Sequence, residues 1–233
     1  MSKITSIIRL IVPLLLCGGL LAGCLQAGER SGFTREERRI LREQDSVLYV
    51  TVVTDPSDSL ILRTPCTDLS DRALRSEHFR LFAEKLKATV QAPWEDGVGI
   101  AGPQVGINRR VICVQRFDKA GEPFEVYANI RIDSLFGPVT LSREGCLSVP
   151  DLRGYVPRRD GAVISYTDPG TLSRVSETVR DFTAIIFQHE CDHLDGILYT
   201  DRADSVFFSE QSAAERKHYD SLGYYVKPQA LIR

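Results

Sequence analysis

Apolar residues recur with helical spacing in two segments of the chain. Within 76–90, the residues that share one helical face are Phe79, Phe82, Ala83, Leu86 and Val90. Within 181–194, the residues on one stripe are Phe182, Ile185, Ile186, His189 and His193. Spacing of this kind is typical of an amphipathic helix with a buried face. We therefore predict a helix in each segment, and the second one places two histidines on its apolar stripe.

Runs of β-branched and apolar residues predict strands in other parts of the chain. The predicted strands are 47–53, 110–116, 124–129, 162–167 and 174–179. Turn residues in Asp118–Gly121 and Asp168–Gly170 each separate two of these runs, which predicts two hairpins. Hairpins combined with one central and one upstream helix indicate an α+β domain.

The first residues have the organisation of an export signal. Lys3 and Arg9 are basic, the segment Leu10–Leu20 is mostly apolar, and Leu21-Ala22-Gly23-Cys24 follows. This order is typical of a secretory signal peptide, and its last four residues resemble the bacterial lipobox, whose cysteine is lipidated. We expect residues 1–23 to be a lipoprotein signal peptide and Cys24 to carry lipid. An ordinary signal peptide or an uncleaved anchor is the alternative.

The remaining polarity pattern divides the mature chain into three parts. Residues 24–45 are polar and charged, so we expect a tether that includes a charged helix near Thr34–Gln44. The strand and helix signals predict one folded domain over 46–205, which contains the site motifs described below. The mostly polar segment 206–233 is expected to form a C-terminal helix and tail.

Composition and charge narrow the class of protein. Of 233 residues, 43% are hydrophobic and 26% are charged, as in ordinary globular proteins. The formal net charge is −2 and no dense run of Lys and Arg is present, so we expect no nucleic-acid partner. The cysteines are irregularly spaced without a CxxC pair, which favours separate roles over a disulfide framework.

The strongest local motif is His189-Glu190-Cys191-Asp192-His193. Histidines at i and i+4 lie on one helical face, so both imidazoles can reach one metal ion while the glutamate reaches a water. The motif alone suggests a zinc peptidase, but the longer HExxHxxGxxH pattern is not completed. Cys146 in Glu144–Ser148 is a candidate third ligand that leaves one position open for water. A buried structural thiol is the alternative for Cys146.

Three motifs in a fixed order resemble the peptide deformylase family. They are GxGxAxxQ at Gly97–Gln104, EGCLS at Glu144–Ser148 and HExDH at His189–His193. Leu62–Cys66 and Arg153–Arg158 also resemble the family's LRxP and RGxVPR segments, so the resemblance spans roughly residues 60–202. It implies an α+β fold of the deformylase type, with antiparallel or mixed β-sheets around a central HExxH helix.

The resemblance implies a metal-dependent hydrolase that removes the N-formyl group from formyl-methionyl peptides and releases formate. It implies one divalent metal ion held by Cys146, His189 and His193, with Fe²⁺ frequent in the family and Zn²⁺, Ni²⁺ or Co²⁺ able to replace it. Glu190 would be the general acid/base. The side-chain amide of Gln104 and the backbone N–H of Leu147 would stabilise the oxyanion.

The resemblance also implies how the peptide is held. The backbone of Gly99 would pair with the extended peptide, and an apolar pocket would take the methionine side chain. The residues implied in substrate binding are Val98, Gly99, Gly145, Ile185 and Ile186.

Charged residues beside the ligands are expected to orient them, because metal-bound histidines usually donate their other nitrogen to an acceptor. These residues are Glu144, Asp192 and Arg158, and Arg158 can pair with either carboxylate. Four positions depart from the family pattern and put pocket shape and substrate preference in question: Gly102, Ile130, Tyr155 and Asp181.

The export signal and the family's usual work on nascent chains point to different compartments. We expect a membrane-anchored lipoprotein whose catalytic domain lies outside the cytoplasm, with a cytoplasmic enzyme as the alternative. Two other functions remain open: an exported HExxH metallopeptidase, and a lipoprotein that binds peptides without turnover. The intact set of Cys146, Gln104, Glu190 and both histidines argues against the idle binder.

Overall fold

The computed structural model describes residues 32–95, 97–224 and 227. The signal peptide and lipidation predicted for residues 1–24 lie outside these residues. The helices are α2 (Arg35–Glu43), α3 (Pro56–Leu62), α4 (Asp71–Leu74), α5 (Glu77–Val90), α6 (Asp181–Leu194) and α7 (Glu210–Ser221), with short 3-10 helices η1 (Gly102–Val105) and η2 (Tyr199–Asp201). The strands are β1 (Gly99–Ala101), β2 (Val111–Gln115), β3 (Phe124–Cys146), β4 (Val149–Thr167), β5 (Arg174–Arg180) and β6 (Ser205–Phe208).

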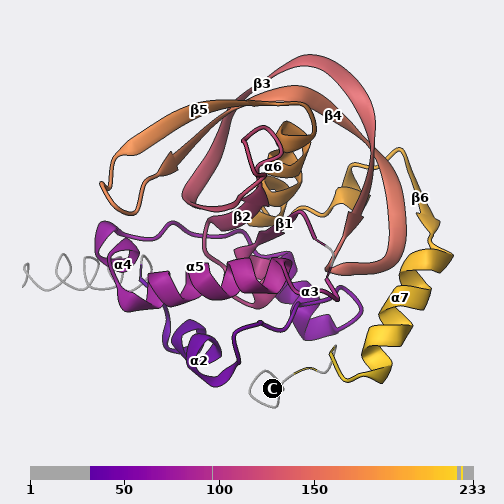
Figure 1. The fold of residues 1–233 in the computed structure, drawn as a ribbon, viewed down its shortest axis with the longest axis horizontal. Helices are drawn as coiled ribbons and strands as arrows, with labels where there is room; N and C mark the ends of the chain where they lie inside the picture. The colour runs from indigo at the N-terminus through magenta and orange to yellow at the C-terminus, as the bar shows by residue number, and fades with distance from the viewer. Residues whose placement is uncertain (1–31, 96, 225–226, 228–233) are drawn as a thin grey trace, which may run out of the picture.

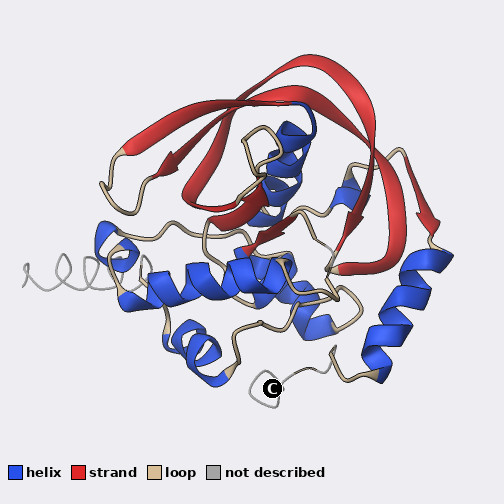
Figure 2. Ribbon diagram, viewed as in Figure 1, coloured by secondary structure: helices blue, strands red, loops and turns tan. Residues whose placement is uncertain are grey.

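The strands form one antiparallel sheet in the order β1-β2-β3-β4-β5, and β6 pairs with β4. Figure 1 shows the long strands β3 and β4 as an arch that curves over α6, with α5 crossing below it. Helix α6 packs against β1 through β5. Figure 2 shows the other helices gathered below and beside the sheet, so the fold is α+β with α6 at its centre.

The strands β3 and β4 are much longer than the sequence predicts. The strand predicted over 124–129 corresponds to the start of β3, but β3 continues to Cys146. Register shifts interrupt the β3–β4 pairing at four places, including Ala128/Arg131 and Phe136/Val139. Each bulge turns the following side chains to the other face, so the alternation that reveals a strand is lost. These bulges also bend the pair into the arch that surrounds α6.

Both predicted long helices are confirmed. Helix α5 begins after Ser76, whose side-chain oxygen accepts a hydrogen bond from the backbone N–H of Phe79. This bond satisfies one of the free N–H groups of the first turn. Helix α6 spans Asp181–Leu194, and most of its residues are buried. The predicted stripe, however, is not buried throughout, because Phe182 is exposed and Ile185 and His189 are half-buried.

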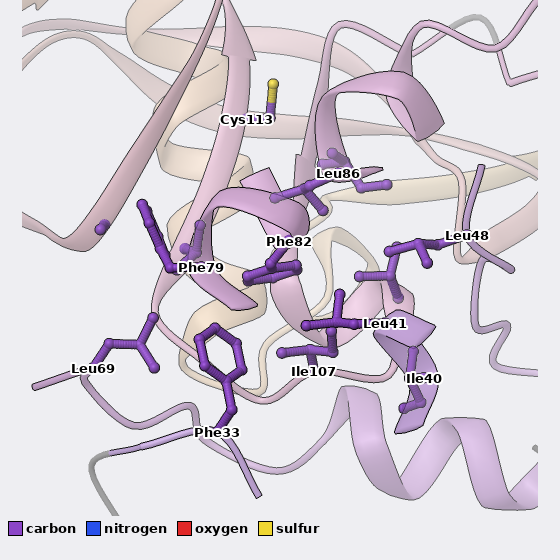
Figure 3. Close-up of a cluster of buried hydrophobic side chains, with 14 of the residues drawn as sticks. Phe33, Ile40, Leu41, Leu48, Leu69, Phe79, Phe82, Leu86, Ile107 and Cys113 are labelled. Carbon is purple, nitrogen blue, oxygen red and sulfur yellow. The ribbon is translucent and has the colours of Figure 1, made fainter. Parts of the chain in front are cut away.

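Helix α2 belongs to the main hydrophobic core. Phe33, Ile40 and Leu41 are buried against α5 in the cluster that Figure 3 shows. Glu37 accepts hydrogen bonds from Arg109 at 2.8 to 3.1 Å, and both side chains are buried. The charged helix expected near Thr34–Gln44 is confirmed as α2, but from Phe33 onward the segment packs into the core and is not the tether expected over 24–45. Charged residues dominate this helix, and they hid the few apolar positions that anchor it.

The strand predicted for 47–53 is wrong, because these residues form an extended segment outside the sheet. The backbone N–H of Thr51 donates to the carbonyl of Gln104 at 2.8 Å, and that of Val53 donates to the carbonyl of Ser148 at 2.9 Å. Its β-branched residues are typical of a strand, but its backbone partners are a short helix and a turn. The segment consequently ties η1 to the turn between β3 and β4.

The C-terminal region begins with strand pairing. The boundary predicted at residue 206 falls inside β6, which pairs with β4 over Ser205–Phe208. Helix α7 follows beside β6 at one edge of the molecule (Figure 1). Within the described residues, no helix combines the length and apolarity needed to cross a membrane.

Candidate active site

Two histidines and a cysteine from different elements converge at the centre of the fold. His189 and His193 lie one turn apart on α6, and Cys146 is the last residue of β3. Ligand atoms of the three residues lie within 4.8 Å of one another, and the Sγ of Cys146 is 3.2 Å from Nε2 of His193. A thiolate and two imidazoles are a common donor set for catalytic zinc and related divalent ions. The residues present therefore fit one metal ion, as the sequence predicts.

A buried carboxylate orients the first histidine. Nδ1 of His189 lies 2.8 Å from Oε2 of Glu144, which leaves Nε2 for coordination. Metal-bound histidines commonly make such a bond through the second nitrogen, because it sets the ring orientation and the tautomer. Glu144 thus has the orienting position that the sequence predicts for it.

Arg158 resolves a choice that the sequence leaves open. Its guanidinium donates to Glu144 at 2.8 and 3.1 Å and to Asp192 at 2.7 Å, so it pairs with both carboxylates. Arg202 also donates to Asp192, at 2.8 and 2.9 Å. The network joins β3, β4 and α6, and it holds Glu144 against His189.

Burial and hydrogen bonding move the pKa values of the ionisable groups here in different directions. Burial alone would raise the pKa of Glu144, but hydrogen bonds from His189 and Arg158 outweigh it and lower that pKa. Burial lowers the pKa of His193 well below its ordinary value, which keeps this imidazole neutral. For His189, hydrogen bonds with Cys146 and Glu144 outweigh burial and raise the pKa. A metal ion at this site competes with that proton.

Glu190 is buried beside the cysteine–histidine group. Its Oε2 has no hydrogen-bond partner among the described residues, and burial raises the pKa of the carboxyl to about 7. A carboxyl with a pKa near neutral pH can both accept and donate a proton. A Cβ built on Gly99 would come within 2.5 Å of Oε1 of Glu190 and 2.8 Å of Ile186, so only glycine leaves room there.

Gln104 points its side chain into the same site from η1. Its Oε1 accepts from the backbone N–H of Ala101 at 2.8 Å. Its Nε2 donates to the hydroxyl of Ser148 at 3.2 Å and approaches Sγ of Cys146 at 3.6 Å. The carbonyl oxygen is thus fixed on the backbone, and the amide N–H₂ faces the cysteine.

One cavity of about 480 Å³ contains most of the predicted site. The predicted residues that line it are Val98, Gly99, Gln104, Glu144, Gly145, Cys146, Leu147, Ile185, Ile186, His189 and Glu190. His193, Asp192 and Arg158 do not line it; the last two lie behind α6, in a second cavity. The cavity thus brings together residues predicted as metal ligands, as catalytic residues and as substrate-binding residues.

The same cavity has walls that the sequence analysis missed. Additional lining residues include Trp94, Glu95, Arg153 and, on α7, Ser212, Glu215, Arg216 and Tyr219. The guanidinium of Arg153 lies against Gly145, where an added Cβ would meet it at 2.6 Å. Helix α7 has a polar composition that is typical of a solvent-exposed helix, and this hid its contribution.

Comparisons with known proteins agree with this geometry. The family model for polypeptide deformylase matches residues 49–207. A peptide deformylase from Leptospira biflexa is 34% identical over 153 residues, which is 63% of this chain and 84% of that protein. A chloroplastic/mitochondrial peptide deformylase from Arabidopsis thaliana is 34% identical over 208 residues, covering 83% of this chain and 73% of the relative.

Solved structures of peptide deformylases also resemble this chain. A class I type b peptide deformylase from Acinetobacter baumannii, bound to actinonin, has a TM-score of 0.59 and 34% identity. The similarity covers 68% of this chain and 99% of that one. A peptide deformylase from Thermotoga maritima has a TM-score of 0.59 and 28% identity, with coverage of 68% and 99%.

The fold and the site define a metal-dependent hydrolase, with a cysteine and two histidines placed where they could hold the ion and a buried glutamate beside them. The family match covers more than half of the chain and contains all three motifs. The chain belongs to the peptide deformylase family.

Proposed function

We propose that this chain removes the N-formyl group from peptides that begin with formyl-methionine and releases formate. The observation that carries the proposal is the convergence of Cys146, His189 and His193 beside Glu190 and Gln104 in one cavity. Membership of the peptide deformylase family supports the same reaction. The solved relatives from Acinetobacter baumannii include complexes with actinonin and with Met-Ala-Ser, so a short peptide suits this kind of site.

We propose Cys146, His189 and His193 as the ligands of one divalent metal ion. When bound, the ion supplies Lewis-acid activation of water for attack on the formyl group. The thiolate and imidazole donors suit Fe²⁺, Zn²⁺, Ni²⁺ or Co²⁺. We favour Zn²⁺ or another redox-stable ion for an exported form, since a thiolate-ligated Fe²⁺ site oxidises readily. Metal analysis of the purified chain should give about one ion, and Cys146→Ala should abolish tight binding.

Glu190 is proposed to move the proton of the reaction. It would take a proton from the attacking water and deliver it to the amine that leaves the formyl carbon. Its buried carboxyl, with a pKa of about 7 and a free Oε2, suits both steps near neutral pH.

Gln104 and Leu147 are proposed to hold the formyl oxygen as negative charge develops on it. The Nε2 of Gln104 already faces Cys146, and Leu147 lines the cavity from the turn between β3 and β4. Donors fixed in advance stabilise such charge effectively, because they need no reorganisation during the reaction.

The methionine end of the substrate is proposed to lie in the cavity, beside Val98 and the side of α6 that carries Ile185 and Ile186. Val98, Ile185 and Ile186 supply apolar surface for the side chain, while Gly99 and Gly145 let the peptide backbone approach closely.

An assay with three peptides tests the function. Formyl-Met-Ala-Ser, acetyl-Met-Ala-Ser and an unformylated peptide of similar length are incubated with the full chain, and formate, acetate and new amines are measured. We expect rapid release of formate alone. Cleavage of an internal peptide bond would instead identify a metallopeptidase, and binding without any product would identify an idle binder.

We propose separately that the enzyme is a lipoprotein with residues 1–23 removed, Cys24 lipidated and the catalytic domain outside the cytoplasm. The ordered basic, apolar and Leu-Ala-Gly-Cys segments support this, and two acyl chains anchor far better than one. Labelling with a palmitate analogue and cell fractionation, with Cys24→Ala as the control, tests it. An unlabelled protein in the cytoplasm would contradict it.

A further inference from the structure

Helix α7 presents one side to the active-site cavity. Four of its residues line the cavity at i, i+3, i+4 and i+7 spacing: Ser212, Glu215, Arg216 and Tyr219. Residues with this spacing lie on one helical face. The match to the family ends at residue 207, so the whole helix lies beyond it. The cavity is thus lined both by residues inside the family match and by a helix outside it.

Contacts hold α7 in place at both ends. The backbone N–H of Ser209 donates to the carbonyl of Asp151 at 2.8 Å, directly before the helix. After the helix, Tyr224 stacks on Trp94 at the cavity rim, with ring centroids 4.0 Å apart. Lys227 then binds Asp58 at 2.6 Å and Asp55 at 3.0 Å. These contacts make the wall a fixed part of the site.

Two arginines line this part of the cavity, where the acidic side chains of Glu95 and Glu215 also lie. Arg216 projects from α7, and Arg153 lies over Gly145 of the EGCLS motif. Within the described ranges, Arg153 forms no ion pair with any carboxylate. Glu95 is the acidic neighbour of Arg216: burial raises the pKa of its carboxyl to about 7, and the charge of Arg216 offsets part of that rise.

The size of the cavity limits what can be bound. A volume of about 480 Å³ lies within the range of sites that enclose small ligands. A peptide of two or three residues that starts at the Cys146–His189 group would therefore end inside the cavity. Its terminal carboxylate would lie against the cavity wall, where charged side chains can bind it. Guanidinium groups are well suited to this, because they bind carboxylates through paired hydrogen bonds.

We propose that α7 makes this enzyme selective for short formyl peptides, and that Arg216 together with Arg153 binds their free C-terminal carboxylate. The inference rests on the proposed deformylase function and names its substrate class. Arg216 and Arg153 act on specificity and take no part in the chemical step. Released formyl peptides are then better substrates than long chains, whose carboxylate lies far from the formyl group.

The test compares formyl-Met-Ala-Ser with its C-terminal amide, using the full chain and the variant Arg216→Gln. For the free acid, we expect KM to rise about tenfold in the variant with kcat nearly unchanged. For the amide, the variant should match the wild type. Lys217→Gln is the matched control, because it removes a positive charge from an exposed neighbour on the same helix. Arg216→Lys should recover part of the loss, and Glu95→Gln should strengthen the preference for the acid.

A second readout separates this inference from the reaction. Calorimetry measures binding of the product Met-Ala-Ser and of its amide, so it is informative even if no formate is released. Tighter binding of the acid that is lost in Arg216→Gln supports the proposal. The proposal would be overturned if the wild type showed equal KM and equal affinity for the acid and the amide. It would also be overturned if Arg216→Gln and Lys217→Gln changed these values equally. Failure of formate release with retained selectivity in binding would instead contradict the proposed function.

Discussion

Gly99 leaves the space that the carboxylate of Glu190 occupies: a Cβ at residue 99 would stand 2.5 Å from Oε1. Strand β1 and helix α6 therefore approach closely at the point where the proton is proposed to move. The glycine motif and the histidine motif, far apart in the sequence, depend on each other through this contact.

The first prediction concerns this contact. Gly99→Ala forces Glu190 or Ile186 to shift, and displacement of a catalytic group by about 1 Å can lower turnover by ~10²-fold. We expect metal content to stay at the wild-type level while kcat/KM for formyl-Met-Ala-Ser falls by this order. Gly170→Ala, in the turn between β4 and β5, is the control. Unchanged kcat/KM in Gly99→Ala would show that the contact is unimportant.

The second prediction concerns the bond between Glu144 and His189. Glu144→Gln keeps the side-chain volume but removes the charge that orients the imidazole. Loss of such a partner typically lowers metal affinity by about 10–100-fold. Competition with a coloured chelator measures this affinity. Glu125→Gln, in an arginine network away from the site, should leave it unchanged; an equal drop in both variants would argue against the orienting role.

The third prediction concerns helix α2. Glu37 and Arg109 form a buried pair, so Glu37→Ala removes the carboxylate of that pair and should destabilise the fold by about 3–5 kcal/mol. Glu43→Ala, on the same helix, removes only an exposed pair with Arg39 and should change stability by about 0–1 kcal/mol. Denaturant unfolding measures both. Similar small effects would mean that α2 behaves as a tether after all.

The fourth prediction concerns pH. Burial raises the pKa of Glu95 from 4.5 to about 7, so the folded protein holds a proton that the unfolded chain releases. The protonated carboxyl of Glu95 contributes to stability below pH 4.5, and this contribution is lost as pH rises towards 7. Glu95→Gln cannot ionise, so relative to wild type it should gain stability, on the order of 2–3 kcal/mol, between these pH values. Unfolding at pH 4.5 and pH 8 measures the difference, with exposed Glu84→Gln as the control. Equal pH dependence in wild type and Glu95→Gln would contradict the prediction.

The sequence predicts the centre of the site well. The bounds of α6 follow from its apolar stripe, and the spacing of His189 and His193 follows from helix geometry. Cys146, Gln104 and Glu190 were located through motifs, each of which has its own chemical task. These residues meet in one cavity because of long-range packing, which cannot be predicted from the local pattern of a single sequence.

Other parts of the structure could not be predicted, for physical reasons. The bulges in β3 and β4 erase the alternation that marks a strand, so their full length is invisible in the sequence. Arg158 could pair with Glu144 or with Asp192, and only the folded structure shows that it pairs with both. The polar face of α7 looks like a solvated surface until β6 places it against the cavity.

The most direct test of the central claim is the rate of formate release by Glu190→Gln. The variant preserves the volume of a buried side chain but cannot carry the proton, so metal content should match wild type. Loss of a positioned acid/base typically lowers the rate by ~10²–10⁴-fold. We predict a fall in kcat within this range for formyl-Met-Ala-Ser at equal metal occupancy. Formate release at a near wild-type rate would contradict the proposed mechanism.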